Sequence, residues 1–297
     1  MYISNICAFM TGIWLKKNDY CKYLVADFRD PLYNPSFRSR KAELNYDKKC
    51  MKKIINYSDF VVGVSQGIID GITENVNKKI KVKVITNGFD SDDVPENTKV
   101  AIESEEKNIK HFVYTGAMYG NQRDIKPFFK ILNELINDKL IDKTKIKIHY
   151  AGNDFLELES QAKIFGLENI VVNHGFVSRE KSLSLQQSAD GLILLTGNNQ
   201  NYQGVIPGKL FEYMSYETIP IIALVSGNKA NSEVKNIVNS AKCGVVYEES
   251  DESSYSELKQ YIVDIVNGNL KFHSQTKQYN YEQISKKYIE FILKEER

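Results

Sequence analysis

The sequence predicts an α/β protein with parallel β-sheets in two domains. Short apolar runs of the length of buried strands alternate with longer segments in which apolar residues recur at helical spacing. The chain has 297 residues, more than the roughly 100–200 residues of an ordinary single domain. The stretch from Ser91 to Lys110 is polar and acidic and contains Pro95, a composition typical of linkers. We therefore expect a first domain at residues 1–95 and a second at 96–274.

The first predicted element is a helix in the apolar segment Tyr2 to Leu15. This segment is shorter than the roughly 18 residues that a membrane-spanning helix needs, and it lacks the basic leader and cleavage site of a signal peptide. We expect this helix to be buried. We expect the protein to be cytoplasmic, either free or bound peripherally at the inner face of the cell membrane.

The rest of the first domain alternates strand and helix, an order typical of parallel strands joined by crossover helices. Ser65 precedes an amphipathic run and is expected to cap its helix, and Asn87-Gly88 forms a turn after the last strand. The predicted segments are Tyr23–Asp27 (strand), Lys41–Tyr57 (helix), Phe60–Val64 (strand), Gln66–Val76 (helix) and Lys81–Thr86 (strand).

The second domain repeats this alternation and is predicted to be a parallel sheet covered by helices on both faces. In such sheets ligands bind at the carboxyl ends of the strands, where turns lead into helices. The predicted strands are Phe112–Thr115, Lys145–Ala151, Ile170–His174, Gly191–Leu195, Pro220–Leu224 and Gly244–Tyr247, and the predicted helices are Ile125–Asn137, Phe155–Phe165, Ser178–Ser188 and Lys209–Ser215.

Composition limits the class of partner. The formal net charge is +1, with 39 Lys and Arg against 38 Asp and Glu, so we expect no field that attracts nucleic acid. The four cysteines have neither zinc-site spacing nor the density of a disulfide scaffold. We expect them to be reduced and mostly buried.

The turn from Thr115 to Asp124 joins a strand to a helix and has residues suited to phosphate. Gly116 and Gly120 would let the backbone approach a ligand closely, and Arg123 offers a fork of N–H donors. The sequence is neither a P-loop nor the G-x-G-x-x-G fingerprint. A tight turn with a solvent-facing arginine explains the same residues.

Two further turns could contribute to a binding site. In the turn from His174 to Ser178 a flat base could lie against Phe176 or Val177, although a histidine here is more often structural. After the next strand, Thr196 and Gly197 lead into the polar run Asn198 to Gln203, whose Asn and Gln side chains could meet sugar hydroxyls. A flexible loop without ligand contacts is the alternative for that run.

The segment from Gly204 to Met214 carries the most informative signal. Pro207 and Gly208 suit a loop that becomes a helix, whose free N–H groups favour an anion. Lys209 would neutralise phosphate charge, and Glu212, one turn later on the same face, could accept hydrogen bonds from two ribose hydroxyls. A surface helix with an incidental ion pair is the alternative.

In order and spacing these segments resemble the GT-B glycosyltransferases, in particular glycosyltransferase family 4. The resemblance covers most of the chain and rests above all on IPGKLFEYMSYETIPII, from Ile206 to Ile222. It also includes the arginine-bearing turn after the first strand of the second domain. Further matching segments are ADFRDP from Ala26, TNGFD from Thr86, HGFVS from His174, SADGLILL from Ser188, and Tyr279 to Leu293, which resembles the C-terminal helix (275–297) that returns to the first domain.

The resemblance implies two Rossmann-like domains and transfer of a sugar from a nucleotide-diphosphate sugar to a glycan or lipid-linked acceptor, in surface-polysaccharide synthesis. Arg123 and Lys209 would hold the diphosphate and stabilise the leaving group in place of a metal, and Glu212 would bind the ribose. The family commonly retains the anomeric configuration, and the chain has no clear Asp-x-Asp metal motif. We expect neither a cofactor nor a metal.

Two features depart from the family pattern. Many relatives carry a second glutamate eight residues before the ribose-binding one, where this chain has Gly204. A complete first domain also has strands before ADFRDP, so we expect an incomplete N-terminal domain with an exposed sheet. A second copy or a partner chain covering that sheet, or a truncated gene product of low activity, are the alternatives.

Asp27, Arg29 and Asp30 follow a strand of the first domain and are candidates for the acceptor side. A charge pair that fixes the loop explains them equally well. For the whole chain, the alternative to an active enzyme is a non-catalytic or partner-dependent nucleotide-sugar-binding subunit. A third reading is a sugar-nucleotide epimerase, a class that can share the fold.

Overall fold

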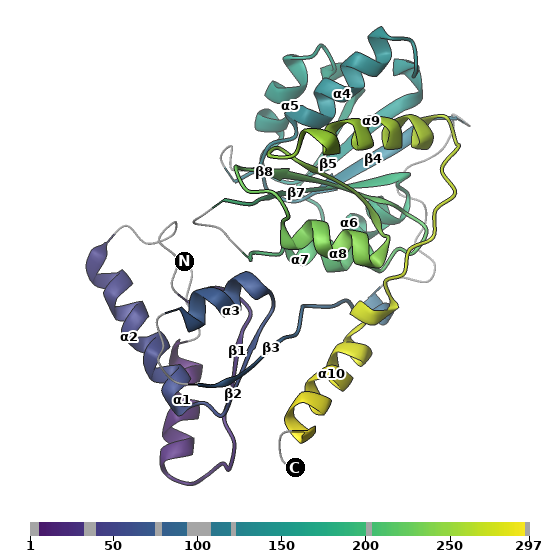
Figure 1. The fold of residues 1–297 in the computed structure, drawn as a ribbon. Coiled ribbons are helices and arrows are strands. Elements are labelled where there is room, and N and C mark those ends of the chain that lie inside the picture. Colours follow the sequence, from purple (N-terminus) through teal and green to yellow (C-terminus); the bar gives the residue numbers. More distant parts are fainter. Residues whose placement is uncertain are drawn as a thin grey trace. The chain divides into compact units, whose positions relative to one another are not determined.

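The computed structural model describes residues 6–32, 40–74, 79–93, 108–119, 123–199 and 204–294. The chain divides into two compact units (Figure 1). Unit 1 comprises Met1–Gly88, Asn199–Ile206 and Tyr281–Arg297, and unit 2 comprises Phe89–Asn198 and Pro207–Asn280.

The described residues of unit 1 form a three-stranded parallel sheet in the order β1-β2-β3. The predicted cap is present, because Ser65 Oγ accepts a hydrogen bond from the Ile68 amide. The predicted order of elements is confirmed, with most limits within two residues. The strands are β1 (Val25–Phe28), β2 (Phe60–Gly63) and β3 (Lys81–Val84), and the helices are α1 (Ile6–Lys17), α2 (Lys41–Tyr57) and α3 (Gln66–Thr73).

The first helix is less buried than the sequence suggested. Within α1 only Ile13 is fully buried, and Trp14 is 55% exposed. The apolar residues of α1 surround the helix, but among the described residues one side of it packs on the core. There the ring of Phe9 stacks on Phe28 at 5.0 Å between centroids. An all-round apolar pattern indicates burial only where partners exist on every side.

The C-terminal helix α10 (Tyr281–Lys294) packs against the sheet of unit 1. Ile284 joins Val62 and Ile85 in one apolar cluster, and the ring of Phe291 meets that of Phe60 edge-on at 5.5 Å. This packing ties the end of the chain to its first strands.

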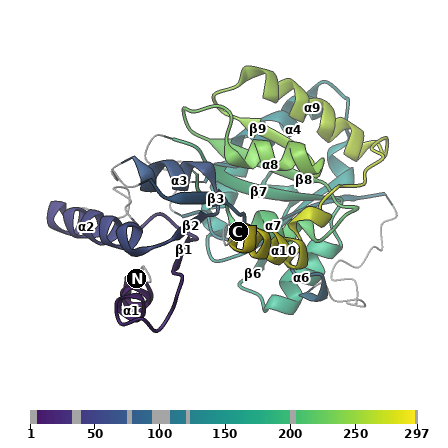
Figure 2. The same ribbon diagram turned by 60° about the horizontal axis from the view of Figure 1, so that its bottom comes forward.

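Unit 2 contains a six-stranded parallel sheet in the order β6-β5-β4-β7-β8-β9. Figure 2 shows β6 and β9 at opposite edges of it. The order reverses between β4 and β7, which is the topological switch point of this sheet. The strands are β4 (Lys110–Thr115), β5 (Ile146–Ala151), β6 (Val171–Gly175), β7 (Gly191–Gly197), β8 (Ile221–Ser226) and β9 (Gly244–Glu248).

Helices cover both faces of this sheet, with α4, α5 and α9 on one side and α6, α7 and α8 on the other (Figure 1). Phe112, Tyr114, Ile148 and Tyr150 point into the first of these layers and are fully buried. The sequence-based prediction contains neither α8 nor α9. The helices are α4 (Lys126–Asn137), α5 (Phe155–Lys163), α6 (Arg179–Gln187), α7 (Gly208–Met214), α8 (Glu233–Ala241) and α9 (Glu252–Val266), with 3₁₀ turns η1 (Ser91–Asp93), η2 (Lys143–Lys145), η3 (Glu168–Ile170) and η4 (Lys277–Tyr279).

The two ends of unit 2 lie side by side. Phe89 and Asn280 form a parallel bridge, and the Phe89 amide donates a hydrogen bond of 3.0 Å to the Tyr279 carbonyl. The predicted linker begins as η1, and its residues 94–107 lie outside the described part of the chain.

The cysteines are less buried than expected. Cys50 and Cys243 are buried, but Cys21 is half-buried and Cys7 is exposed on α1. Burial raises the pKa of the Cys243 thiol to about 12, so this thiol stays protonated. Among the described residues no helix is both long enough and apolar enough to cross a membrane.

Candidate functional site

The carboxyl edge of the unit 2 sheet, at its switch point, contains most of the residues that the sequence analysis selected. Each strand at this point has a buried threonine at or next to its end: β4 ends at Thr115, and Thr196 is the last residue but one of β7, before Gly197. A switch point of this kind is where open parallel sheets bind ligands. Thr196 therefore lies beneath this edge, with its side chain in the protein interior.

The turns after β4, β5 and β6 are joined by backbone hydrogen bonds. The Gly116 amide donates to the Ala151 carbonyl at 3.0 Å, and the Gly152 amide donates to the Gly175 carbonyl at 2.9 Å. The Tyr150 hydroxyl donates to the Gly116 carbonyl at 3.0 Å. These contacts make one continuous surface of the three turns.

Arg123 lies against its own turn. Its Nη1 donates a hydrogen bond of 3.2 Å to the Ala117 carbonyl, and its guanidinium is 4.3 Å from the ring centroid of Tyr119. Gly120 lies outside the described residues. Within the described part of the chain Arg123 and Lys209 do not contact each other, so their joint hold on a diphosphate stays a prediction.

Lys209 and Glu212 occupy one face of α7, as their spacing predicts. Lys209 Nζ lies 2.6 Å from Glu212 Oε1, and the two side chains are 35% and 21% exposed. Pro207 is half-buried at the start of the helix, and Gly208 is exposed. Because α7 has only seven residues, the positive charge here comes mainly from the lysine side chain.

A buried polar network lies directly beside Glu212. Gln186, on the last turn of α6, is fully buried, and its Nε2 lies 2.7 Å from Glu212 Oε1. The same nitrogen lies 3.0 Å from Thr115 Oγ1 and 3.1 Å from Ser182 Oγ. The Tyr213 hydroxyl lies 3.1 Å from Thr115 Oγ1, and burial raises its pKa, so this ring stays neutral.

The sequence analysis did not find Gln186. Gln186 and Gln187 are neighbours of the same type, and only the register of α6 on the sheet decides which one points inward. Arg179 was missed as well. Its Nη1 lies 3.8 Å from Glu212 Oε2. Lys209 therefore lies at Oε1 of Glu212, and a second cation, Arg179, lies near Oε2.

The turn after β6 presents an aromatic ring at the same edge of the sheet. Phe176 is 82% exposed, and Val177 beside it is half-buried. Such a ring could stack on a flat base. His174 Nε2 lies 2.9 Å from His149 Nδ1, and His149 Nε2 lies 2.9 Å from His111 Nδ1, which accords with a structural role for His174.

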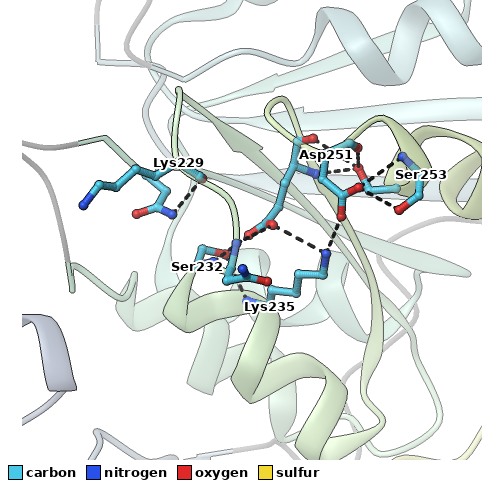
Figure 3. A network of polar contacts seen from close by, with 9 residues as sticks. Lys229, Ser232, Lys235, Asp251 and Ser253 are labelled. Carbon is cyan, nitrogen blue, oxygen red and sulfur yellow. Dashed lines mark hydrogen bonds and ion pairs between the residues drawn. The ribbon is translucent and has the colours of Figure 1, made fainter.

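The turns after β7 and β8 are also held in place. Asn198 donates through its backbone amide to the Ser226 carbonyl at 2.7 Å and through Nδ2 to the Lys229 carbonyl at 2.9 Å. Glu248, which is fully buried, accepts hydrogen bonds from the amides of Asn231 and Ser232. Figure 3 shows this network, in which Lys235 also pairs with Asp251 at 2.6 Å. Residues 200–203 of the polar run lie outside the described residues.

Two of the three candidates in unit 1, Asp27 and Arg29, support a loop. Arg29 binds Asp27 Oδ2 through Nε at 2.9 Å and Nη2 at 2.6 Å. Its Nη1 also donates to Asn87 Oδ1 at 3.2 Å and to the carbonyls of Ile85 and Thr86. Asp30 is exposed. Arg29 thereby connects the ends of β1 and β3, which accords with the charge-pair alternative.

Gly204, where the resemblance to family 4 predicts a glutamate, packs within unit 1. Its carbonyl accepts a hydrogen bond of 2.6 Å from Ser65 Oγ. A Cβ on Gly204 would lie 2.5 Å from Ser65 Oγ and 2.7 Å from the Ile68 nitrogen. The backbone also has a φ of +75°, so this position has no room for a glutamate side chain.

A cavity of about 710 Å³ opens at the opposite, amino-terminal edge of the unit 2 sheet. Lys110, Asp190 and Thr218 are among the residues that line it, and the first two form an ion pair of 2.8 Å. None of the predicted donor-site residues lines this cavity. The described residues contain no group of three or more His, Cys, Asp or Glu arranged to hold a metal ion.

The sequence matches no protein-family model and no curated protein. Solved structures are similar over nearly the whole chain. The lipopolysaccharide outer core galactosyltransferase WaaB has 17% identity and a TM-score of 0.62, with 98% of this chain and 73% of that one covered. Sucrose-phosphate synthase from Thermosynechococcus elongatus has 13% identity and a TM-score of 0.62, with 96% and 71% covered.

Anabaena HepE in complex with UDP has 15% identity and a TM-score of 0.63, with 97% of this chain and 77% of that one covered. At these identities the likeness concerns the fold. Together with the two parallel sheets, it shows that this chain has the GT-B fold.

Proposed function

We propose that this chain is a glycosyltransferase of the family 4 type. It transfers a sugar from a nucleotide-diphosphate sugar to a glycan or lipid-linked acceptor in the assembly of a surface polysaccharide. The observation that carries the proposal is the position of Glu212, which is held beside Lys209 by a buried network at the switch point of the unit 2 sheet.

The side chains at this edge suit the parts of a nucleotide-diphosphate sugar. Lys209 and Arg123 supply positive charge for the diphosphate, and Glu212 supplies carboxylate oxygens for the ribose hydroxyls. Phe176 offers an exposed ring for the base. Gly116 and Gly208 allow the backbone to approach the ligand, and Val177, Pro207 and the buried Thr196 shape the surrounding turns.

The reaction needs stabilisation of the leaving group. As the bond between the sugar C1 and the diphosphate oxygen breaks, its electron pair moves to that oxygen. The two cations would stabilise this charge without a bound metal. We propose that the reaction is metal-independent, needs no cofactor and retains the anomeric configuration.

The ligands and roles of similar structures support this class of donor. Anabaena HepE is described in complex with UDP-glucose, and Staphylococcus aureus TarM in complex with UDP and α-GlcNAc-glycerol. WaaG is described as a glycosyltransferase involved in lipopolysaccharide biosynthesis. By analogy we propose a uridine or related diphosphate sugar as donor for this chain and a surface-polysaccharide intermediate as acceptor.

Nucleotide protection against heating tests the donor site. Saturating UDP or GDP should raise the melting temperature by several degrees, since a ligand at about 100 times its Kd adds about 2.7 kcal/mol to the free energy of unfolding. The rise should persist in EDTA. Lys209→Ala combined with Glu212→Ala should abolish it because both proposed contacts are lost.

The control for this experiment is Lys259→Ala combined with Glu134→Ala, another ion pair of unit 2, with a distance of 3.2 Å between α9 and α4. This variant should keep the nucleotide-induced rise. No rise with either nucleotide in the unmodified protein would refute the proposal, and loss of the rise in EDTA would refute its metal-independent form.

A second candidate is a binding subunit that works only with another chain. The observation that favours it is a surface of unit 1 where Trp14 and Tyr20 stack at 5.5 Å yet remain 55% and 70% exposed. Exposed aromatic surface of this kind often marks a protein interface, with a second copy or a different chain. Purified protein that binds nucleotide but neither hydrolyses nor transfers sugar until a co-purifying partner is added would favour the subunit.

A further inference from the structure

Gln186 has an environment that its place on a polar helix does not explain. Its side chain is fully buried, although amides prefer exposed positions. Its Nε2 faces three oxygen atoms, on Glu212, Thr115 and Ser182, at 2.7–3.1 Å. Only one of these three acceptors, the Glu212 carboxylate, is charged.

The surroundings fix which way this amide points. With the amide reversed, its oxygen would lie 2.7 Å from Glu212 Oε1, and two acceptors would repel each other. In the observed orientation Gln186 Oε1 is buried and has no hydrogen-bond partner among the described residues. A buried oxygen without a partner destabilises the fold. Glu212 therefore sets the orientation of the amide, although this leaves Gln186 Oε1 without a hydrogen bond among the described residues.

The contacts on Glu212 differ between its two oxygens. Oε1 receives Lys209 Nζ at 2.6 Å and Gln186 Nε2 at 2.7 Å, which together use its two lone pairs. Among the described residues, the contact on Oε2 is that with the more distant Arg179, at 3.8 Å. One oxygen is thus anchored from inside the protein, and the other remains able to accept a hydrogen bond from a ligand.

We propose that Gln186 is a positioning residue of the donor site: its buried amide holds Oε1 of Glu212 so that Oε2 meets a ribose hydroxyl. This inference rests on the proposed function. It adds that selectivity for ribose depends on a side chain that does not touch the ligand. Lys209 alone does not fix the carboxylate, because its flexible ammonium can follow Glu212 through several rotamers.

The test compares Kd values for UDP, 2′-deoxy-UDP and 3′-deoxy-UDP, measured by calorimetry. The unmodified protein should bind UDP about 10-fold or more tightly than at least one deoxy analogue, because a hydrogen bond to a carboxylate is lost. Gln186→Met keeps the length of the side chain and removes both N–H groups. It should reduce this preference to below about 3-fold while UDP still binds through Lys209.

Two controls separate positioning from general damage. Gln187→Met makes the same change one residue away and should keep the full ribose preference. Glu212→Gln should lose the preference, and adding Gln186→Met to it should cause no further loss, since the two residues act through one contact. If circular dichroism shows that Gln186→Met does not fold, Gln186→Asn, too short to reach Glu212, takes its place with the same expectation.

The outcomes are distinguishable. A folded Gln186 variant that keeps the full ribose preference overturns this inference and leaves the donor site intact. Additive effects of Gln186→Met and Glu212→Gln overturn it as well. If the unmodified protein binds neither UDP nor GDP, the proposed function fails, and the inference falls with it.

Discussion

Gly152 shows how closely the turns of the candidate site approach one another. A Cβ on this residue would lie 2.3 Å from the Gly116 carbonyl oxygen and 2.3 Å from the Tyr150 hydroxyl. Neither neighbour can yield easily, because one is backbone and the other is a buried ring that also accepts from the Asp154 amide. Only a glycine lets the turns after β4 and β5 pack at this distance.

Gly152→Ala should therefore lower the free energy of unfolding of unit 2 by about 1–3 kcal/mol, the usual range for overpacking. Gly71 in α3 is the matched control, since no atom lies within 4 Å of a Cβ built there. Gly71→Ala should raise stability by about 0.5–1 kcal/mol because alanine favours the helix. Urea unfolding followed by circular dichroism measures both, and shifts of the same sign would contradict the argument.

At the scale of elements, three histidines connect β4, β5 and β6. His111, His149 and His174 form a chain of ring nitrogens with 2.9 Å at each step. Burial, aided by the charges of the other two histidines and Lys147, lowers the pKa of His149 to about 3. Burial also lowers the pKa values of His111 and His174, with Asp190 opposing this at His111 and Lys181 adding to it at His174.

The sign of the pH effect follows from this lowered pKa. In the unfolded chain a histidine has a pKa near 6.5 and binds a proton below that pH. In the folded protein His149 binds this proton only near pH 3. The contribution of His149 to the free energy of unfolding is therefore complete above pH 6.5. It decreases by up to about 1.4 kcal/mol per pH unit as the pH falls from 6.5 to about 3.

His149→Gln should reduce the stability lost between pH 7 and pH 5 by about 1–2 kcal/mol, because glutamine does not titrate. Melting temperatures of the variant and the unmodified protein at both pH values measure this difference. His273→Gln, which changes a histidine that is 67% exposed, controls for the loss of any histidine. An equal acid sensitivity in His149→Gln and the unmodified protein would rule out this origin.

At the scale of the whole molecule, the proposed donor site predicts where a nucleotide slows hydrogen exchange. Saturating UDP should protect amides in the turns after β4 and β6 and in α7, because these segments carry the proposed contacts. Helix α9 lies on the other face of the sheet (Figure 1) and should exchange at an unchanged rate. Exchange followed by mass spectrometry measures both, and protection centred on unit 1 would contradict the site.

Much of the fold could be predicted because buried parallel strands are continuous apolar runs and their helices are amphipathic. Helix α8 carries that signal too: Ser232 caps it, and Val234, Ile237, Val238 and Ala241 recur at helical spacing. This pattern is sufficient to predict α8, although the sequence-based prediction omitted the helix. The incomplete burial of α1 was not predictable, since apolar residues around a whole helix do not reveal which sides have partners.

In the candidate site, too, some residues could be predicted from the sequence and others could not. Lys209 and Glu212 could be found because their spacing places them on one helical face. Gln186 could not, because it acts from another helix and its role depends on tertiary contacts with Glu212 and Thr115. For Asp27 and Arg29, residue type alone left two readings open, and the hydrogen bonds of Arg29 to three consecutive residues after β3 bear on that choice.

The neighbouring ends of unit 2, at Phe89 and Asn280, have a consequence for protein engineering and for evolution. Because the chain enters at Phe89 beside the point where it leaves at Asn280, the intervening segment can be exchanged as one cassette. Such a graft needs only two adjacent joins, and the loop that contains Gly204 travels with it. Recombination between related genes at these two joins would exchange the whole candidate site of unit 2 in one step.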